Sequence, residues 1–121
     1  MLQKHILLVG DTHILEPFLG PLRAEGIAIT VIPQVRSVLE KTKLLHPTAI
    51  VFVLPRYWDD ITVFVDEIRK DAEFEQTPIL YVGSLIEGED QHILQQKGVK
   101  TLTLGPLPPQ EVVRYLLDMM K

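Results

Sequence analysis

The sequence predicts a single α/β domain in which helices cover both faces of a parallel sheet. Five short apolar runs alternate along the chain with longer segments of helical periodicity. Most of these runs are continuously apolar, which is typical of strands buried on both faces. The chain has 121 residues, which is enough for one compact core. We therefore expect residues 1–121 to form one domain, a three-layer α/β/α sandwich.

The five apolar runs are the predicted strands. Their lengths of four to six residues favour strands over helices. They cover residues 5–9, 27–32, 49–54, 79–82 and 101–104. The run Ala-Ile-Val-Phe-Val-Leu at 49–54 is the most uniformly apolar, so we expect helices to cover both of its faces.

Four of the connecting segments are straightforward helix predictions, over residues 35–45, 60–70, 91–97 and 109–121. Over 60–70, apolar residues recur at the spacing of one helix face. Gly98 is placed to end the third of these helices, and Pro109 suits the first turn of the last. Asp59 and Asp60 precede the apolar face of the 60–70 helix, where we expect them to cap its N-terminus.

The segment after the first strand gives conflicting signals. Asp11 is a good N-cap for a helix whose apolar residues follow at helical spacing. Pro17, Gly20 and Pro21 lie inside the same segment, and an interior proline costs a helix about 3 kcal/mol. We therefore expect a kinked or late-starting helix that ends at Gly26.

Composition excludes several classes of function. Twelve Lys and Arg against sixteen Asp and Glu give a net charge of −4, which does not supply the basic surface of a nucleic-acid-binding domain. There is no cysteine, so thiolate metal sites and cysteine nucleophiles are excluded. The histidines have no metal-ligand spacing, and nucleotide-binding loops and a nucleophile elbow are missing. No run is long enough to cross a membrane. We expect a cytoplasmic protein that is not an enzyme and binds no metal or cofactor.

Four motifs resemble those of the receiver domains of bacterial two-component response regulators, in order and at similar spacing along the whole chain. They are ILLVGD at 6–11, PTAIVFVLP at 47–55, TPILYVGS at 77–84, and the segment from Gly98 to Pro106. The resemblance implies the flavodoxin-like (βα)5 fold of CheY, with the parallel strands in the order 2-1-3-4-5. It also implies a cis peptide bond before Pro106.

The same resemblance implies that the phosphorylation chemistry of receivers is missing. Val53 stands where receivers carry the phosphoacceptor Asp, and their Mg²⁺-binding acidic pair is replaced by Gly10 and Asp11. Gly83 takes the place of their Thr or Ser, and Gly105 that of the Lys that precedes Pro106. Valine has no oxygen with which to form an acyl phosphate. The resemblance therefore implies a degenerate receiver, a pseudo-receiver.

Two surfaces are candidates for binding a partner. One is the crevice expected where the first and third strands end, near His13, Arg56, Tyr57 and Trp58. Arg, Tyr and Trp are the residue types that dominate binding hot spots, although Trp58 has the alternative of folding over the core. The other surface is implied by the resemblance. It comprises the fourth helix, fifth strand and fifth helix, through which receivers contact partners or a second copy.

Our main hypothesis from the sequence is a signalling module that acts by protein–protein contact without phosphorylation. One alternative is a receiver phosphorylated on a non-standard residue, Asp11 or Asp59. Another is a sensor that binds a small ligand in the crevice at the ends of the first and third strands.

Overall fold

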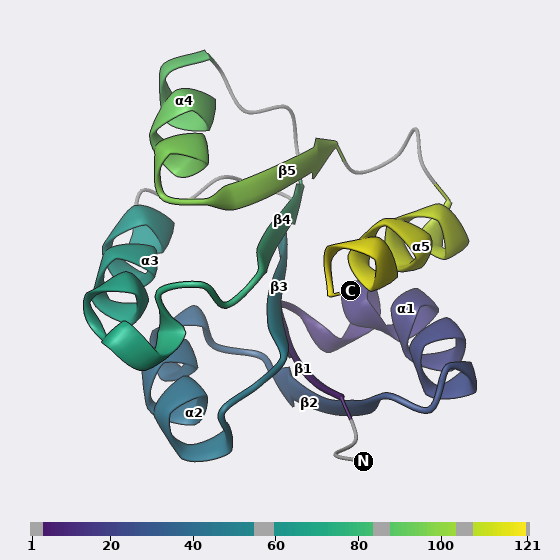
Figure 1. Ribbon diagram of the computed structural model, residues 1–121. Coiled ribbons are helices and arrows are strands. Elements are labelled where there is room, and N and C mark those ends of the chain that lie inside the picture. The colour runs from purple at the N-terminus through teal and green to yellow at the C-terminus, as the bar shows by residue number, and fades with distance from the viewer. Residues whose placement is uncertain (1–3, 55–59, 84–87, 104–107, 121) are drawn as a thin grey trace.

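The computed structural model describes residues 4–54, 60–83, 88–103 and 108–120, and its centre is a five-stranded parallel sheet (Figure 1). The strands are β1 (His5–Val9), β2 (Ala28–Ile32), β3 (Ala49–Leu54), β4 (Ile79–Gly83) and β5 (Val99–Thr103). They pair in the order β2-β1-β3-β4-β5. This confirms the predicted order. The bounds of β1 and β3 agree with the prediction, and β5 begins two residues before the predicted run.

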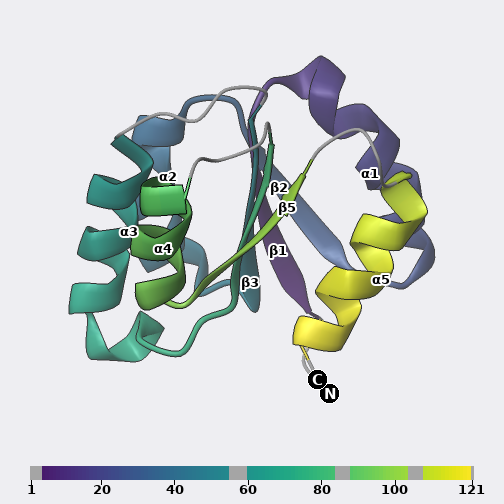
Figure 2. The ribbon, with the colours of Figure 1, turned by 90° about the horizontal axis from the view of Figure 1, so that it is seen from above.

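Helices lie on both sides of this sheet (Figure 2). On one side are α1 (Thr12–Ala24) and α5 (Pro109–Met119), and on the other are α2 (Val38–Leu45), α3 (Asp60–Lys70) and α4 (Gly88–Gln96). There are also two short 3₁₀ helices. η1 (Val35–Ser37) precedes α2, and η2 (Ala72–Phe74) follows α3. The predicted three-layer sandwich is confirmed.

β3 separates the two halves of the core. All six of its residues are buried. Ala49, Val51 and Val53 belong to the cluster under α1 and α5, while Ile50, Phe52 and Leu54 belong to the cluster under α2, α3 and α4. Side chains of a strand alternate between its faces, so a central strand covered on both sides must be apolar throughout.

The expectation of a late-starting first helix was wrong. α1 begins at Thr12, directly after Asp11, whose carboxylate accepts a hydrogen bond of 2.9 Å from the His13 N–H. The helix continues through both prolines and ends at Ala24, two residues before Gly26. It does so because Leu15, Phe18 and Leu22 are buried between α1 and the sheet. At about 2 kcal/mol each, these buried side chains offset the cost of the prolines.

The other helix ends follow from backbone conformation. Gly98, two residues beyond α4, has a φ of +77°, a left-handed conformation that glycine adopts without strain. Pro109 is the first residue of α5, as predicted. The predicted helix over 35–45 is divided into η1 and α2. α4 begins three residues before the predicted start, and η2 was not predicted.

A helix that crosses a membrane must be both long and apolar. Within the described ranges, none of the helices combines the length and hydrophobicity that a bilayer crossing demands.

Candidate functional site

The candidate site lies at the edge of the sheet where β1, β3 and β4 end. The strand register pairs Val9 with Phe52 and Leu54 with Gly83, so the residues at these strand ends are neighbours. The structure thereby brings together Gly10, Val53 and Gly83, which the sequence placed far apart. In open α/β sheets, this edge is where ligands bind.

Gly10 is packed directly against β3. Its φ is +151°, and a Cβ atom at this position would overlap the carbonyl oxygen of Val53. Any side chain here requires the backbone of β1 or β3 to move. The close approach of the two strands therefore requires a glycine at this position. Glycine also offers no carboxylate.

Val53 is completely buried, with an exposed fraction of 0%. Its side chain belongs to the core cluster under α1 and α5 and contributes to the packing there. It offers neither a nucleophile nor a metal ligand.

Gly83 makes room for a tyrosine, which the sequence reasoning did not anticipate. A Cβ atom at Gly83 would overlap the carbonyl oxygen of Leu54 and the phenol of Tyr81. Tyr81 is itself fully buried, and its phenol lies where a side chain at Gly83 would begin. The sequence signal was the Tyr-x-Gly spacing in β4, which puts both residues on one face of the strand.

Asp11 is the acidic residue of the predicted site that lies within the described part of the chain. It is exposed, and its Oδ1 accepts the hydrogen bond from the His13 N–H that caps α1. The predicted N-cap role is confirmed. His13 is exposed on the first turn of the same helix.

A hollow of about 530 Å³ opens beside this cap. Its lining includes Asp11, Thr12 and His13 from the start of α1, and the apolar residues Val35 and Leu54. A polar rim above an apolar floor is the usual arrangement of a small-molecule pocket.

Several predicted site residues lie outside the described residues. These are Arg56, Tyr57, Trp58, Asp59, Gly105 and Pro106, with the expected cis bond before Pro106. In the ranges that the structure describes, His, Asp and Glu side chains form no cluster of three or more that would hold a metal ion.

A second hollow, of about 380 Å³, lies along β5 between α4 and α5. Gln91 and Gln95 of α4, Lys100 and Thr101 of β5, and Tyr115 of α5 line it. Tyr115 is among the large apolar side chains that remain exposed. This is the face that the sequence analysis singled out as the second partner surface.

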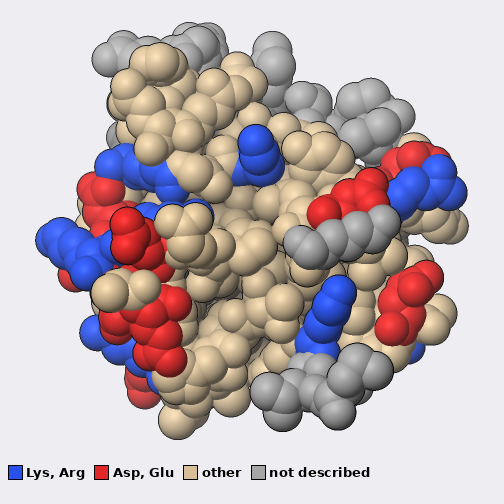
Figure 3. Space-filling view, in the orientation of Figure 1, with Lys and Arg blue, Asp and Glu red and all other residues tan. Residues whose placement is uncertain are grey.

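Acidic and basic side chains are interspersed over the face of the molecule drawn in Figure 3. Neither sign forms a broad field there. Such mixed charge suits contact with another protein better than contact with a phosphate backbone.

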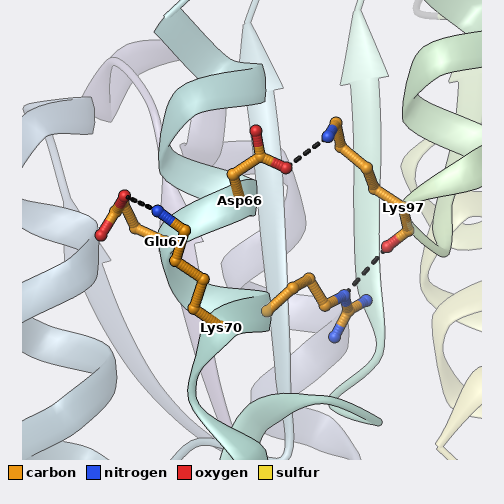
Figure 4. Close-up of polar contacts among 5 residues, drawn as sticks. Asp66, Glu67, Lys70 and Lys97 are labelled. Atoms are coloured by element: carbon orange, nitrogen blue, oxygen red, sulfur yellow. Dashed lines mark hydrogen bonds and ion pairs between the residues drawn. The ribbon is translucent and has the colours of Figure 1, made fainter.

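The opposite end of the sheet, where β4 and β5 begin, is held by a half-buried cation. The guanidinium of Arg69 on α3 donates hydrogen bonds to the carbonyl oxygens of Lys97 (2.9 Å), Phe74 (2.8 Å) and Thr77 (2.7 Å), and a longer one to that of Gly98 (3.4 Å). Lys97 is in turn paired with Asp66 of α3 (Figure 4). Partial burial lowers the pKa of Arg69. The guanidinium nevertheless remains charged in water at any ordinary pH.

The fold of this chain is similar to that of solved receiver domains. A chemotaxis response regulator of Vibrio cholerae, CheY4, is 18% identical over 98% of this chain and 99% of its own, with a TM-score of 0.83. A CheY-like receiver domain protein from Methanospirillum hungatei is 17% identical over 98% and 94%, with a TM-score of 0.84. This chain has the CheY-like receiver fold.

The receiver fold also occurs in a sensor histidine kinase of Pseudomonas aeruginosa. Its receiver domain is 21% identical over 98% of both chains, with a TM-score of 0.77, and holds a magnesium ion in its active-site cleft. No protein-family model matches the chain, and no curated protein sequence is detectably similar to it.

Proposed function

We propose that this domain is a signalling module that keeps the receiver fold and acts by binding a protein partner, without phosphorylation of an aspartate. One observation carries the proposal: the position that the receiver resemblance assigns to the phosphoacceptor is Val53, an aliphatic residue packed into the core with no exposed surface. Acyl phosphate formation requires a carboxylate that solvent and the phosphodonor can reach.

The neighbouring residues support the same proposal. Gly10 and Gly83 leave no space for a carboxylate or a hydroxyl at their positions, because the backbone of β3 lies against both. Asp11 is already engaged as a helix cap. One carboxylate falls short of the several oxygen ligands that Mg²⁺ takes in proteins.

Intact-mass measurement after incubation with acetyl phosphate and Mg²⁺ tests the proposal. We expect the mass of the unmodified chain, while a phosphorylatable receiver treated in parallel gains one phosphoryl group. A phosphorylated species that disappears in Asp11→Asn or Asp59→Asn would instead establish the alternative of a receiver phosphorylated at a non-standard aspartate. Glu16→Gln on the exposed side of α1 is the matched control, since it removes a carboxylate from the same helix and leaves the Asp11 cap intact.

The hollow beside the α1 cap favours a second candidate function, a sensor of a small ligand. Its volume of about 530 Å³ and its apolar floor of Val35 and Leu54 suit a small organic molecule. Titration with nucleotides, flavins and corrinoids, followed by the fluorescence of Trp58, the single tryptophan of the chain, tests this function. Saturable quenching that His13→Ala abolishes would establish it, and a flat response together with an unchanged melting temperature would exclude these ligand classes.

For the partner surface we propose the face formed by α4, β5 and α5. The exposed Tyr115 and the hollow of about 380 Å³ beside it provide an aromatic anchor and a recess. Aromatic anchors next to recesses are typical of interface hot spots. Once a partner is identified, Tyr115→Ala should weaken its binding about tenfold or more. Val63→Ala on α3, which also removes an exposed apolar side chain but one that does not line this hollow, should leave binding unchanged.

A further inference from the structure

The sheet has two edge strands, β2 and β5, and they differ in how they are protected. β5 reads Val-Lys-Thr-Leu-Thr and carries the exposed Lys100, a typical guard against pairing with another strand. β2 reads Ala-Ile-Thr-Val-Ile and carries no charge, no proline and no glycine. Its first four residues are only partly buried. An uncharged, regular edge of this kind is available for strand addition.

Hydrogen bonds fix which groups of β2 point outward. Ala28 donates to the carbonyl of Lys4, and the Ile32 carbonyl accepts from Gly10, each at 2.9 Å. In a parallel pair, alternate residues face the neighbouring strand. Ala28, Thr30 and Ile32 therefore face β1, and the N–H and C=O groups of Ile29 and Val31 point away from the sheet. No described strand pairs with that side of β2 (Figure 1).

We propose that β2 pairs with the β2 strand of a second copy of this chain. The two strands run antiparallel about a two-fold axis that passes midway between the two Thr30 residues. In this register Ile29 of one copy lies opposite Val31 of the other. Each such pair exchanges two hydrogen bonds, so the two symmetric pairs use all the outward groups of both residues. The two sheets become one continuous sheet. The inference does not rest on the proposed function, since pairing of β2 needs no phosphorylation chemistry.

The neighbouring sequence favours this register over a shift toward the C-terminal end of β2. Pro33, directly after β2, has no N–H to donate. A shift that placed Ile29 opposite Pro33 would therefore lose a hydrogen bond at each end. In the proposed register the side chains of Ile29 and Val31, both half-buried against the α1 side of the sheet, meet their counterparts across the axis. Pairs of β-branched residues stabilise antiparallel strands.

Charge complementarity identifies the occupant as a second copy. Glu25 precedes β2 and Arg36 follows it, and both are exposed. Antiparallel pairing brings the start of one β2 to the end of the other, so Glu25 of each copy lies at the same end of the interface as Arg36 of the other. Two opposite-charge contacts result by symmetry. Within the described part of the chain, neither residue forms an ion pair.

The first test places a charge at Val31, where the side chains of the two copies would meet across the axis. Sedimentation equilibrium of the whole chain from about 10 µM to about 1 mM should show a reversible monomer–dimer equilibrium, since one pair of short strands gives a small interface. Val31→Lys should shift the equilibrium to monomer. Val63→Lys, the same change on the exposed surface of α3, should dimerise like the unaltered chain. The circular dichroism spectrum of each variant checks its fold.

The second test uses residues whose replacement does not disturb folding. Glu25→Arg alone, or Arg36→Glu alone, places like charges at both ends of the interface and should weaken dimerisation about tenfold. The double variant restores opposite charges and should recover the original affinity to within about twofold.

Two outcomes would overturn the inference. One is a chain that stays monomeric across the whole concentration range. The other is a dimer that Val31→Lys leaves intact and Tyr115→Lys dissociates, which would assign self-association to the face of α4, β5 and α5. Neither outcome bears on the acetyl phosphate experiment, so the two proposals fail or stand separately.

Discussion

The Cα of Gly10 lies so close to β3 that a methyl group on it would overlap the Val53 carbonyl oxygen. At this position, therefore, the residue type is set by the contact between two strands. The same holds for Gly83, whose missing side chain leaves space for the phenol of Tyr81. At the residue scale, packed atoms fill the site. Replacing single residues there should lower the stability of the domain and should not create a phosphorylation site.

Gly10→Ala should destabilise the domain by about 2–4 kcal/mol, because the methyl group forces β1 and β3 apart and the backbone is strained at positive φ. Urea denaturation monitored by circular dichroism measures the change. Gly20→Ala is the matched control: it lies within α1 with no atom near its added methyl group, and should stabilise the domain by up to about 1 kcal/mol. Equal effects of the two substitutions would contradict the packing described for Gly10.

Val53→Asp should destabilise the domain by about 3 kcal/mol or more at neutral pH, because it buries a carboxylate among aliphatic side chains. Burial of this kind raises the pKa of a carboxyl above its unfolded value. The penalty is therefore fully present at neutral pH and decreases as the pH falls through the raised pKa. Denaturation at several pH values checks this dependence. The side chain of Val53→Asn does not titrate. The difference in free energy of unfolding between this variant and the unaltered chain should therefore be the same at every pH.

At the scale of elements, α4 is attached by few apolar contacts along its described side chains. Leu94 is its one fully buried side chain in the described residues. Its C-terminal end is held instead by Arg69, which donates to the carbonyls of Lys97 and Gly98, and by the pair of Lys97 with Asp66. A cation at the carbonyl end of a helix is also favoured by the helix dipole. The position of α4, and with it the proposed partner face, therefore depends on these polar contacts of Arg69 and Lys97.

Arg69→Gln should destabilise the domain by about 2 kcal/mol, because carbonyls that accepted from a charged donor lose it. It should also speed amide exchange at the end of α4. Arg69→Lys should not restore the wild-type value, since an ammonium cannot reproduce the fork of a guanidinium. Urea denaturation and hydrogen exchange provide the readouts.

Lys70→Gln on the same helix is the control for Arg69. Lys70 is exposed, and its hydrogen bond to Glu67 raises its pKa. Any stabilisation from this pair is therefore present at neutral pH and lost only as the pH rises through the raised value. An exposed pair of this kind contributes little. We expect no measurable change in the denaturation midpoint, and a loss as large as that of Arg69→Gln would refute the special role of the guanidinium.

At the scale of the whole molecule, the fold is that of receivers, and the chemistry assigned to it depends on whether a divalent ion binds. A site of millimolar affinity would raise the stability by about 1.4 kcal/mol at about 10 mM Mg²⁺. For a domain of this size that is a shift of several degrees in the melting temperature. We expect no shift in a thermal scan with Mg²⁺ relative to a monovalent salt at equal ionic strength. A shift that Asp11→Asn removes would indicate a metal site and count against the proposed function.

Much of the fold could be predicted from the sequence because its signals are local. The continuous apolar run over 49–54 identifies a doubly covered central strand, and the periodicity over 60–70 identifies α3 to the residue. The N-cap at Asp11 and the turn at Gly98 are likewise properties of a few neighbouring residues. The valine at position 53, which the receiver resemblance aligns with the phosphoacceptor, is likewise a feature of the chain itself.

Other features are decided by contacts between distant segments, which no local pattern encodes. α1 continues through Pro17 and Pro21 because its buried face packs on the sheet. Tyr81 occupies the space above Gly83 because β3 and β4 are in register there. Arg69 gathers carbonyls that lie up to 29 positions away in the chain. The sequence by itself determined the order and type of the elements, since propensity and periodicity act over a few residues. Only the tertiary structure decided how the strand ends fill the candidate site, because packing there joins residues that the chain keeps apart.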